Sequence, residues 1–283
     1  MMPYLDIDEH LFGFFNVAAL KEAGKDLAAQ HNSAIPFPHS VIDDFLPPAA
    51  LEACLADFPG QRDPDSRSFD RDQERLKTSF NPDYLSPQVR SLFYSFNSRP
   101  FLQFLENLTG IEGLIPDPFY IGGGFHQIEQ GGHLSVHADF NHHKLMNLER
   151  RINVLIYLNK GWKDEYGGQL ELWDEDMRGC VKSVVPLFNR CVVFNTTSTS
   201  FHGNPQPITH PDCTPRRSIA LYYYTATWDE TRKQHTTHFV PRAHTTDRID
   251  WRIRWQELSN DLFPPLLVRN ARRVKRRLRR LRR

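Results

Sequence analysis

The chain has 283 residues, of which 40% are hydrophobic and 12% aromatic, and its formal net charge is +1. That composition suits one large folded domain, and no apolar run approaches the length that a membrane span needs. The four cysteines lack the spacing of a metal or redox site, and acidic residues precede any apolar stretch at the N-terminus, unlike in a secretory signal. We therefore expect a reduced, cytoplasmic protein.

Residues 1–115 predict a helical N-terminal flank. The four expected helices begin after Asn16, at Pro47-Pro48, at Ser86-Pro87 and at Pro100. Each start carries a residue that favours a helix N-terminus, and Gly110 can end the last helix. Residues 36–46 indicate a short strand. Residues 60–78 are charged and lack periodicity, so we expect a loop there.

From Pro118 the chain changes to short strands separated by Gly, Pro and Asn. The candidate strands are residues 119–121, 124–129, 134–139, 152–158, 169–173, 181–185, 191–195 and 217–225. About eight short strands of this kind predict a β-sandwich or jelly-roll barrel rather than a parallel α/β sheet. We expect a mostly β core over residues 116–230 with the N-terminal helices packed on one outer face, followed by a C-terminal extension over residues 231–263.

One stretch concentrates residues that can bind a metal. His137 and Asp139 are two positions apart, so both project from the same face of a strand, and Gly131-Gly132 is expected to form the turn before it. A third ligand is available at His202. Two histidines and one carboxylate on one face of a metal are the ligand set of non-haem iron(II) oxygenases. Taken alone, each of these residues fits a surface or core position equally well.

The last candidate strand starts with two arginines. If its side chains alternate, Arg216, Ser218 and Tyr222 share one face, and Arg217 lies on the other. A buried guanidinium can hold a carboxylate through a bidentate pair, with the Ser218 hydroxyl as an extra donor. Both arginines can also form a solvated strand end, which is the interpretation we favour for Arg217. Tyr222 is the best aromatic candidate for a substrate mouth.

Five motifs in one order give a more specific signal. They are Gly131–Asp139, Asn153–Trp162, Tyr166–Trp173, Phe201–Gly203 and Arg216–Ser218. Their order resembles the prolyl-hydroxylase-like branch of the 2-oxoglutarate/iron(II)-dependent dioxygenases over about residues 119–228. The resemblance implies a double-stranded β-helix, a jelly-roll core, and a hydroxylation that releases succinate and CO2.

The resemblance also implies the centre of the reaction. It identifies His137, Asp139 and His202 as the catalytic residues and the iron ligands. The implied cofactors are Fe(II), 2-oxoglutarate as co-substrate and O2, and ascorbate can stimulate enzymes of this kind. Related halogenases replace the carboxylate with a small residue, so the intact Asp139 favours hydroxylation.

Three further residues are implied to bind the co-substrate. Arg216 matches the family arginine that pairs with the distal carboxylate of 2-oxoglutarate, with Ser218 beside it. Tyr157 resembles the family tyrosine that lines the same pocket. Gln127 departs from the pattern, because some relatives carry a pocket tyrosine at that place, and it puts that one contact in doubt.

The C-terminal end differs strongly in charge from the rest of the chain. Residues 269–283 hold ten Arg or Lys and no acid, so the rest of the chain has a net charge near −9. Apolar residues at spacings of three and four predict a basic amphipathic tail over residues 264–283. Through residues 266–283 it suits an anionic membrane surface or an acidic partner better than nucleic acid. A frayed, solvated end is the simplest alternative.

These observations predict a cytoplasmic 2-oxoglutarate- and Fe(II)-dependent dioxygenase, peripheral at a membrane if the tail binds one. Its substrate is a prolyl or other amino-acid side chain of a protein or peptide, a small molecule or a glycan precursor. Three alternatives remain: a catalytically silent binding or sensor module, a nucleic-acid-associated protein acting through its tail, and a cupin isomerase on the same barrel.

Overall fold

The protein was analysed as a computed structural model. The residues that the structure describes are 2–59, 63–227, 234–243, Thr245, Asp247 and Trp251. The basic tail predicted over residues 264–283 lies outside them, as does most of the extension over residues 231–263. Within the described part of the chain, no helix is both long and apolar enough to cross a membrane.

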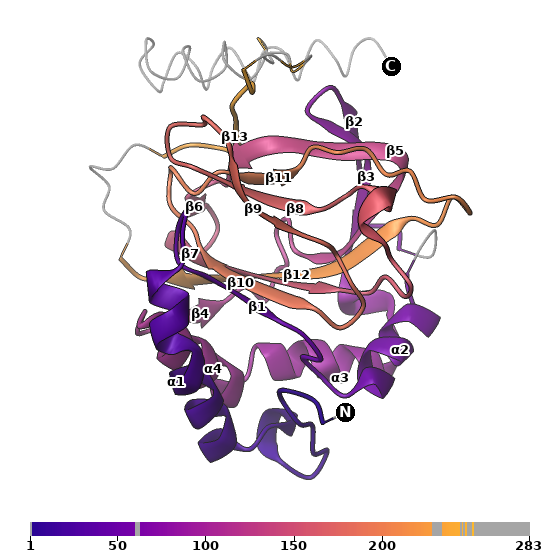
Figure 1. Ribbon diagram of the computed structural model, residues 1–283. Helices are drawn as coiled ribbons and strands as arrows, with labels where there is room; N and C mark the ends of the chain where they lie inside the picture. Colours follow the sequence, from indigo (N-terminus) through magenta and orange to yellow (C-terminus); the bar gives the residue numbers. More distant parts are fainter. Residues whose placement is uncertain are drawn as a thin grey trace, which may run out of the picture.

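Four α-helices lie in the N-terminal part, as predicted (Figure 1). They are α1 (Val17–Ser33), α2 (Pro48–Ala56), α3 (Pro87–Phe96) and α4 (Arg99–Thr109), with short 3-10 turns η1 (Phe12–Phe14), η3 (Pro82–Tyr84) and η4 (Asp164–Tyr166) elsewhere. The expected caps form. The Asn16 side chain accepts a hydrogen bond from the Ala19 N–H at 3.0 Å, and Gly110 ends α4 with a φ of 71°.

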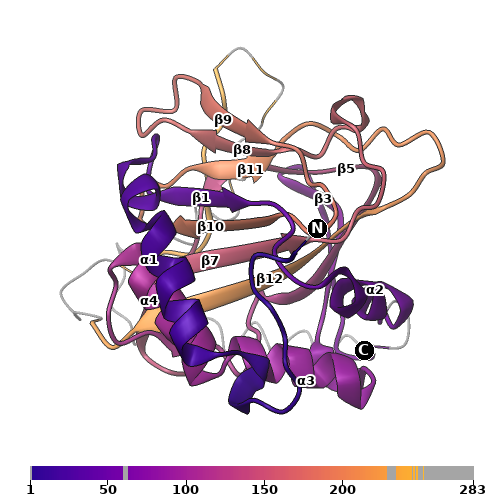
Figure 2. The ribbon, with the colours of Figure 1, turned by 60° about the horizontal axis from the view of Figure 1, so that its bottom comes forward.

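The remaining structure is an antiparallel sheet that curls over itself. Its strands are β1 (His39–Ile42), β2 (Arg67–Arg71), β3 (Glu74–Phe80), β4 (Ile115–Pro116), β5 (Gly124–Ala138), β6 (His142–His143), β7 (Leu148–Tyr157), β8 (Leu170–Trp173), β9 (Cys180–Val184), β10 (Cys191–Asn195), β11 (His202–Asn204), β12 (Arg216–Thr225) and β13 (His238–Phe239). The main order is β1-β10-β7-β12-β5-β11-β8-β9, which gives two facing layers (Figure 2). This is the predicted jelly-roll core.

Strand β5 belongs to both layers. Its first half pairs with β12, where Gly124 lies opposite Ala220, and its second half pairs with β11, where His137 lies opposite His202. Figure 1 shows β8, β9 and β11 in the upper layer and β1, β7, β10 and β12 in the lower one. The space between the layers is therefore lined by residues from both halves of β5.

The helices cover the outer face of the lower layer (Figures 1 and 2). Aromatic side chains fill this contact: Phe101 of α4 packs against Phe96 of α3 at 5.1 Å between ring centroids and against Tyr223 of β12 at 6.2 Å. All three are fully buried, and each such ring contributes about 1.5–3 kcal/mol. The Tyr223 hydroxyl donates to the Phe96 carbonyl at 3.0 Å, so helix and strand are also joined by a hydrogen bond.

The strand expected at residues 119–121 is wrong, because the segment is a turn. The Asp117 carboxylate accepts hydrogen bonds from the N–H groups of Phe119 at 2.9 Å and Ile121 at 2.8 Å. Tyr120 between them has a φ of 47°, which a strand does not allow. The Asp117 side chain thus accepts the backbone hydrogen bonds that a strand would make to a neighbouring strand.

The turn expected at Gly131-Gly132 is also wrong, because the two predicted strands are one continuous strand, β5. Gly131 has a φ of +77°, which bends the strand without reversing it. The segment around Ile208 packs into the bend. The Gly131 N–H donates to the Ile208 carbonyl at 2.9 Å, and the Ile208 N–H donates to the Gly132 carbonyl at 3.1 Å. A glycine pair here marks a bulge rather than a hairpin turn.

The loop expected over residues 60–78 is confirmed at residues 63–66 but is wrong from residue 67 onward. Residues 67–80 form the hairpin β2–β3, and β3 adds to the edge of β5 from Phe80 opposite Phe125 to Glu74 opposite Leu134. A hydrophobicity pattern does not predict strand β3, because charged side chains occupy its inward positions. These charges line the cavity described below.

Candidate metal centre

Three side chains converge at one point between the layers. The ligand atoms of His137, Asp139 and His202 all lie within 4.8 Å of one another. Nε2 of His137 is 3.6 Å from Oδ1 of Asp139, and Nε2 of His202 is 3.3 Å from Oδ2. All three residues are buried, and the pairing of β5 with β11 places the two histidines directly opposite each other. The structure thus brings together the three predicted ligands.

Both histidines are oriented by their own strands. Nδ1 of His137 bonds the carbonyl of Ser135, and Nδ1 of His202 bonds the carbonyl of Ser200, each at 2.9 Å. A carbonyl only accepts, so each Nδ1 carries the proton and each Nε2 keeps a free lone pair. Burial lowers the pKa of His137 and favours the neutral ring. Both Nε2 atoms are therefore set up as metal ligands.

The carboxylate of Asp139 is held from behind by two residues that the sequence analysis did not select. Oδ2 lies 3.0 Å from Nη2 of Arg150 and accepts from Nδ2 of Asn153 at 2.7 Å. Burial raises the pKa of Asp139, but the Arg150 guanidinium outweighs this effect and holds the pKa well below its usual range. Asp139 is therefore ionised at neutral pH.

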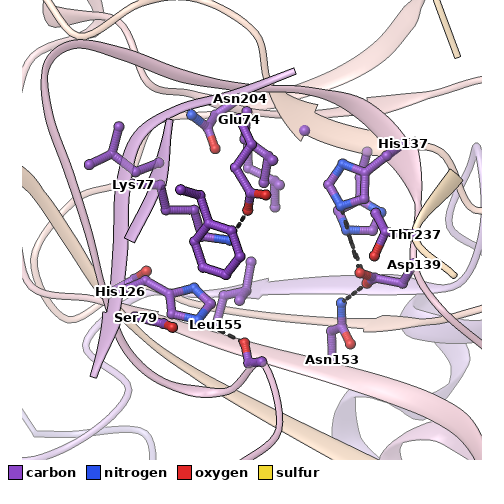
Figure 3. Close-up of a pocket in the computed structure, with 18 of the residues that line it drawn as sticks. Glu74, Lys77, Ser79, His126, His137, Asp139, Asn153, Leu155, Asn204 and Thr237 are labelled. Atoms are coloured by element: carbon purple, nitrogen blue, oxygen red, sulfur yellow. Dashed lines mark hydrogen bonds and ion pairs between the residues drawn. The ribbon is translucent and has the colours of Figure 1, made fainter. Parts of the chain in front are cut away.

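The convergent side chains open onto a cavity of about 200 Å3. Figure 3 shows His137, Asp139 and Thr237 on one side of it, and Lys77, Ser79 and His126 on the other. Part of its wall is β13, whose Phe239 ring lies 5.1 Å from the His137 ring. Neither β13 nor the β2–β3 hairpin was expected to contribute, since neither carries a recognisable motif.

The two arginines at the start of β12 have different environments. Arg216 is buried and lines the cavity; its Nε donates to the Gly168 carbonyl at 2.7 Å, and no carboxylate of the described residues pairs with it. Arg217 lies on the other face, over the Phe58 ring at 4.4 Å and bonded to Gln127 at 2.8 Å. The geometry therefore selects Arg216 as the residue that can bind an anion in the cavity.

The surroundings of Arg216 fit a carboxylate. Its guanidinium carbon lies 4.9 Å from the centre of the Tyr157 ring, and the buried Tyr157 hydroxyl has no hydrogen-bond partner among the described residues. Ser218, two residues along β12, is also buried and lines the cavity. An unpaired buried cation beside an unused hydroxyl is costly unless a ligand completes the site.

Tyr222 and the two histidines that follow Asp139 in the sequence, His142 and His143, lie in different places. Tyr222 lines the cavity as expected, with its hydroxyl donating to the Gly122 carbonyl at 2.8 Å. His142 and His143 form β6, and the buried His143 lies 3.4 Å from Oδ1 of Asp117. His143 therefore belongs to a separate buried contact, and neither histidine lines the cavity.

Known proteins resemble this chain in sequence and in fold. Residues 123–224 match the model of the 2OG-Fe(II) oxygenase superfamily. Prolyl 3-hydroxylase OGFOD1 of Mus musculus is 34% identical over 79 residues, 26% of this chain and 14% of that protein. The Xenopus laevis protein of the same name is 28% identical over 203 residues, 68% of this chain and 35% of that protein. The chain thus spans about a third or less of these curated relatives.

Two solved structures share the fold. One is a prolyl hydroxylase of Trichoplax adhaerens in complex with a hypoxia inducible factor oxygen degradation domain peptide fragment; it has 18% identity, a TM-score of 0.53, and a match covering 74% of this chain and 91% of that one. A prolyl 4-hydroxylase of Phytophthora capsici has 20% identity, a TM-score of 0.50, and a match covering 78% and 68%. At these identities the likeness concerns the fold.

Proposed function

We propose that this chain, whose residues 123–224 match the model of the 2OG-Fe(II) oxygenase superfamily, is a 2-oxoglutarate- and iron(II)-dependent dioxygenase. It hydroxylates an unactivated C–H bond and releases succinate and CO2. The observation that carries the proposal is one cavity that holds both the His137, Asp139 and His202 cluster and the unpaired, buried Arg216.

The proposal assigns each residue a task. His137, Asp139 and His202 would hold the metal at the wall of the cavity. Arg216 and Ser218 receive the distal carboxylate of 2-oxoglutarate, and the free hydroxyl of Tyr157 is a further donor for it. When bound, iron(II), 2-oxoglutarate and O2 together supply the oxidising chemistry.

Other residues maintain this geometry. Arg150 and Asn153 bond the same oxygen of Asp139, which fixes the plane of the carboxylate. Leu155 and Phe140 give the cavity part of its apolar lining. Positioning of this kind is the protein's share of the work in enzymes whose cofactors carry out the reaction.

A protein or peptide side chain is the substrate class that we favour, since the curated relatives are named prolyl 3-hydroxylases. A small molecule or a glycan precursor remains the alternative. We place the protein in the cytoplasm, with contact to an anionic membrane surface or an acidic partner through residues 266–283, which lie outside the described residues.

The direct test is succinate formation from 2-oxoglutarate by protein loaded with iron without oxygen and then exposed to O2. Wild type is compared with His137→Ala and Arg216→Ala. We expect no turnover in His137→Ala, and turnover in Arg216→Ala only at high 2-oxoglutarate. Turnover that survives His137→Ala would contradict the assigned centre.

A binding measurement covers an enzyme that stays idle without its substrate. The wild type loaded with Mn(II), a redox-silent substitute, is titrated with 2-oxoglutarate by calorimetry. Binding that depends on the metal and on Arg216 supports the proposal. No binding refutes it, and binding without turnover under any substrate tested identifies a silent module.

A further inference from the structure

The register of three strands places a second cation near Arg216. Ile128 of β5 lies opposite Arg216 of β12 on one side and opposite Lys77 of β3 on the other. Paired residues project from the same face, and neighbouring strands are about 4.8 Å apart. Lys77 and Arg216 therefore face the same cavity from positions about 10 Å apart.

Lys77 belongs to a trio of charged residues on the β2–β3 hairpin. The Glu74 carboxylate accepts from Nζ of Lys77 at 2.9 Å through Oε1 and from Nη2 of Arg71 at 3.0 Å through Oε2. Glu74 is buried, with 8% of its side chain exposed. Burial raises its pKa, but the two cations outweigh this effect and hold the pKa below its usual range. The trio therefore carries one net positive charge.

The charges lining the cavity do not balance. The ionised side chains among its described lining residues are Arg71, Lys77, Arg150, Arg216, Glu74 and Asp139. Four cations face two carboxylates, which leaves an excess of two positive charges. Iron(II) and the 2-oxoglutarate dianion carry equal and opposite charges, so binding both leaves that excess unchanged. An enclosed excess of this kind attracts anions.

One of the two excess charges is at the hairpin. Arg150 is neutralised by Asp139, and Arg216 would be neutralised by the co-substrate. Each oxygen of Glu74 already accepts from a cation, so its negative charge is paired and the trio has no surplus negative charge for a cationic group. Donors remain available: within the part of the chain that the structure describes, Lys77 uses one of its three N–H groups and the partly exposed Arg71 uses one of five.

From this arrangement we infer that the hairpin end of the cavity, formed by Lys77 and Arg71, binds an oxyanion of the primary substrate. The inference rests on the proposed function, and it adds the substrate class: a molecule with a carboxylate or phosphate group at a distance from the C–H bond that is attacked. Figure 3 shows Lys77 across the cavity from His137 and Asp139. The anion would thus anchor one end of the substrate while another part reaches the metal.

The test uses the full chain loaded with Mn(II) and 2-oxoglutarate, titrated by calorimetry with phosphate or acetate at constant ionic strength set with chloride. We expect one anion site that is roughly tenfold weaker in Lys77→Met, because a hydrogen bond between charged groups is lost. Tighter binding of acetate than phosphate assigns a carboxylate substrate, and the reverse assigns a phosphorylated one.

Two variants keep the result interpretable. Glu74→Gln removes the carboxylate that competes for both cations, so we expect tighter anion binding, the opposite sign from Lys77→Met. Lys25→Met is the matched control, because Lys25 also pairs with a glutamate three residues earlier, at 2.7 Å, on an exposed helix surface. It should bind anions like wild type.

Three results would overturn the inference: no anion site in the wild type, equal affinity in wild type and Lys77→Met, or equal weakening in Lys25→Met. The failure of the proposed function looks different. In that case 2-oxoglutarate does not bind the Mn(II)-loaded wild type at all, whereas failure of the anion site leaves metal and 2-oxoglutarate binding intact.

Discussion

Arg150 and Arg216 are both buried arginines in the same cavity, yet their surroundings differ. Arg150 pairs with Asp139, donates twice to Asn153 and lies 3.6 Å from the centre of the Tyr222 ring. Arg216 has one backbone carbonyl and no acid among the described residues. A buried charge is tolerated when it is paired and is costly when it is not. The charge of Arg150 is thus paired within the folded chain, although its buried Nη1 has no hydrogen-bond partner among the described residues, whereas Arg216 has no acidic partner there.

Among the variants that test this difference, Arg150→Met should have the largest effect. Removing the arginine leaves the buried Asp139 carboxylate without its main cation, so unfolding free energy should fall by about 3–5 kcal/mol. Metal affinity should fall about 10–100-fold, since the carboxylate loses its orientation. Urea unfolding and Mn(II) titration measure the two.

The double variant Arg150→Met with Asp139→Asn is the control for stability. It removes both charges, so it should lose less unfolding free energy than Arg150→Met alone. If Arg150→Met were as stable as wild type, the pair would not hold the site together and the contrast with Arg216 would disappear.

Arg216→Met should give the complementary result. Methionine removes an unpaired buried charge, so the unfolding free energy should stay close to that of wild type or rise. Affinity of the Mn(II)-loaded protein for 2-oxoglutarate should fall by about 1.5–3 kcal/mol, which is tenfold or more. Calorimetry checks this, and unchanged affinity would mean that 2-oxoglutarate binds elsewhere.

Glu74 extends the comparison to a buried carboxylate with two partners. Its pKa is lowered in the folded state, so its pairing stabilises the protein above the unfolded pKa and is lost as pH falls through the folded one. The stability advantage of wild type over Glu74→Gln should therefore be full at neutral pH and shrink below about pH 4.5. Unfolding curves between pH 3 and pH 7 measure it, and an advantage that grows on acidification would contradict the assigned pairing.

Arg217→Met should have the smallest effect. Arg217 lies outside the cavity, and methionine can keep its contact with the Phe58 ring. Affinity for 2-oxoglutarate should stay within about twofold of wild type, and unfolding free energy should change by about 0.5–1 kcal/mol. A large loss of 2-oxoglutarate affinity here would reverse the roles assigned to the two adjacent arginines.

The sequence was sufficient to predict the centre of the cavity because its residues obey strand alternation. His137 and Asp139 are two positions apart, and Arg216 and Ser218 repeat that spacing. Arg150 and Asn153 were missed for a physical reason. Asn153 bonds Asp139, which is fourteen residues earlier in the sequence. β5 and β7 do not pair with each other but lie on either side of β12, so no local sequence pattern predicts this contact.

The cavity wall was predicted less well than its centre. Lys77 and Glu74 are charged residues on an inward face, where a hydrophobicity pattern expects apolar ones. Their partnership becomes visible only when β3 is paired with β5. Gly131 was misassigned because a positive φ serves a bulge as well as a turn.

The passage of β5 through both layers has a consequence for how this molecule can be altered. The same strand carries His137 and Ile128, which lies opposite both Arg216 and Lys77, so the span between the proposed metal and co-substrate sites is fixed by one unbroken piece of backbone. The β2–β3 hairpin pairs with the edge of that strand, and its Arg71 also lies over the Phe239 ring of β13. The residues proposed to bind the metal and co-substrate are therefore separate from the hairpin proposed to bind the substrate anion. The hairpin can be exchanged for another while the distances between the metal and co-substrate sites stay the same.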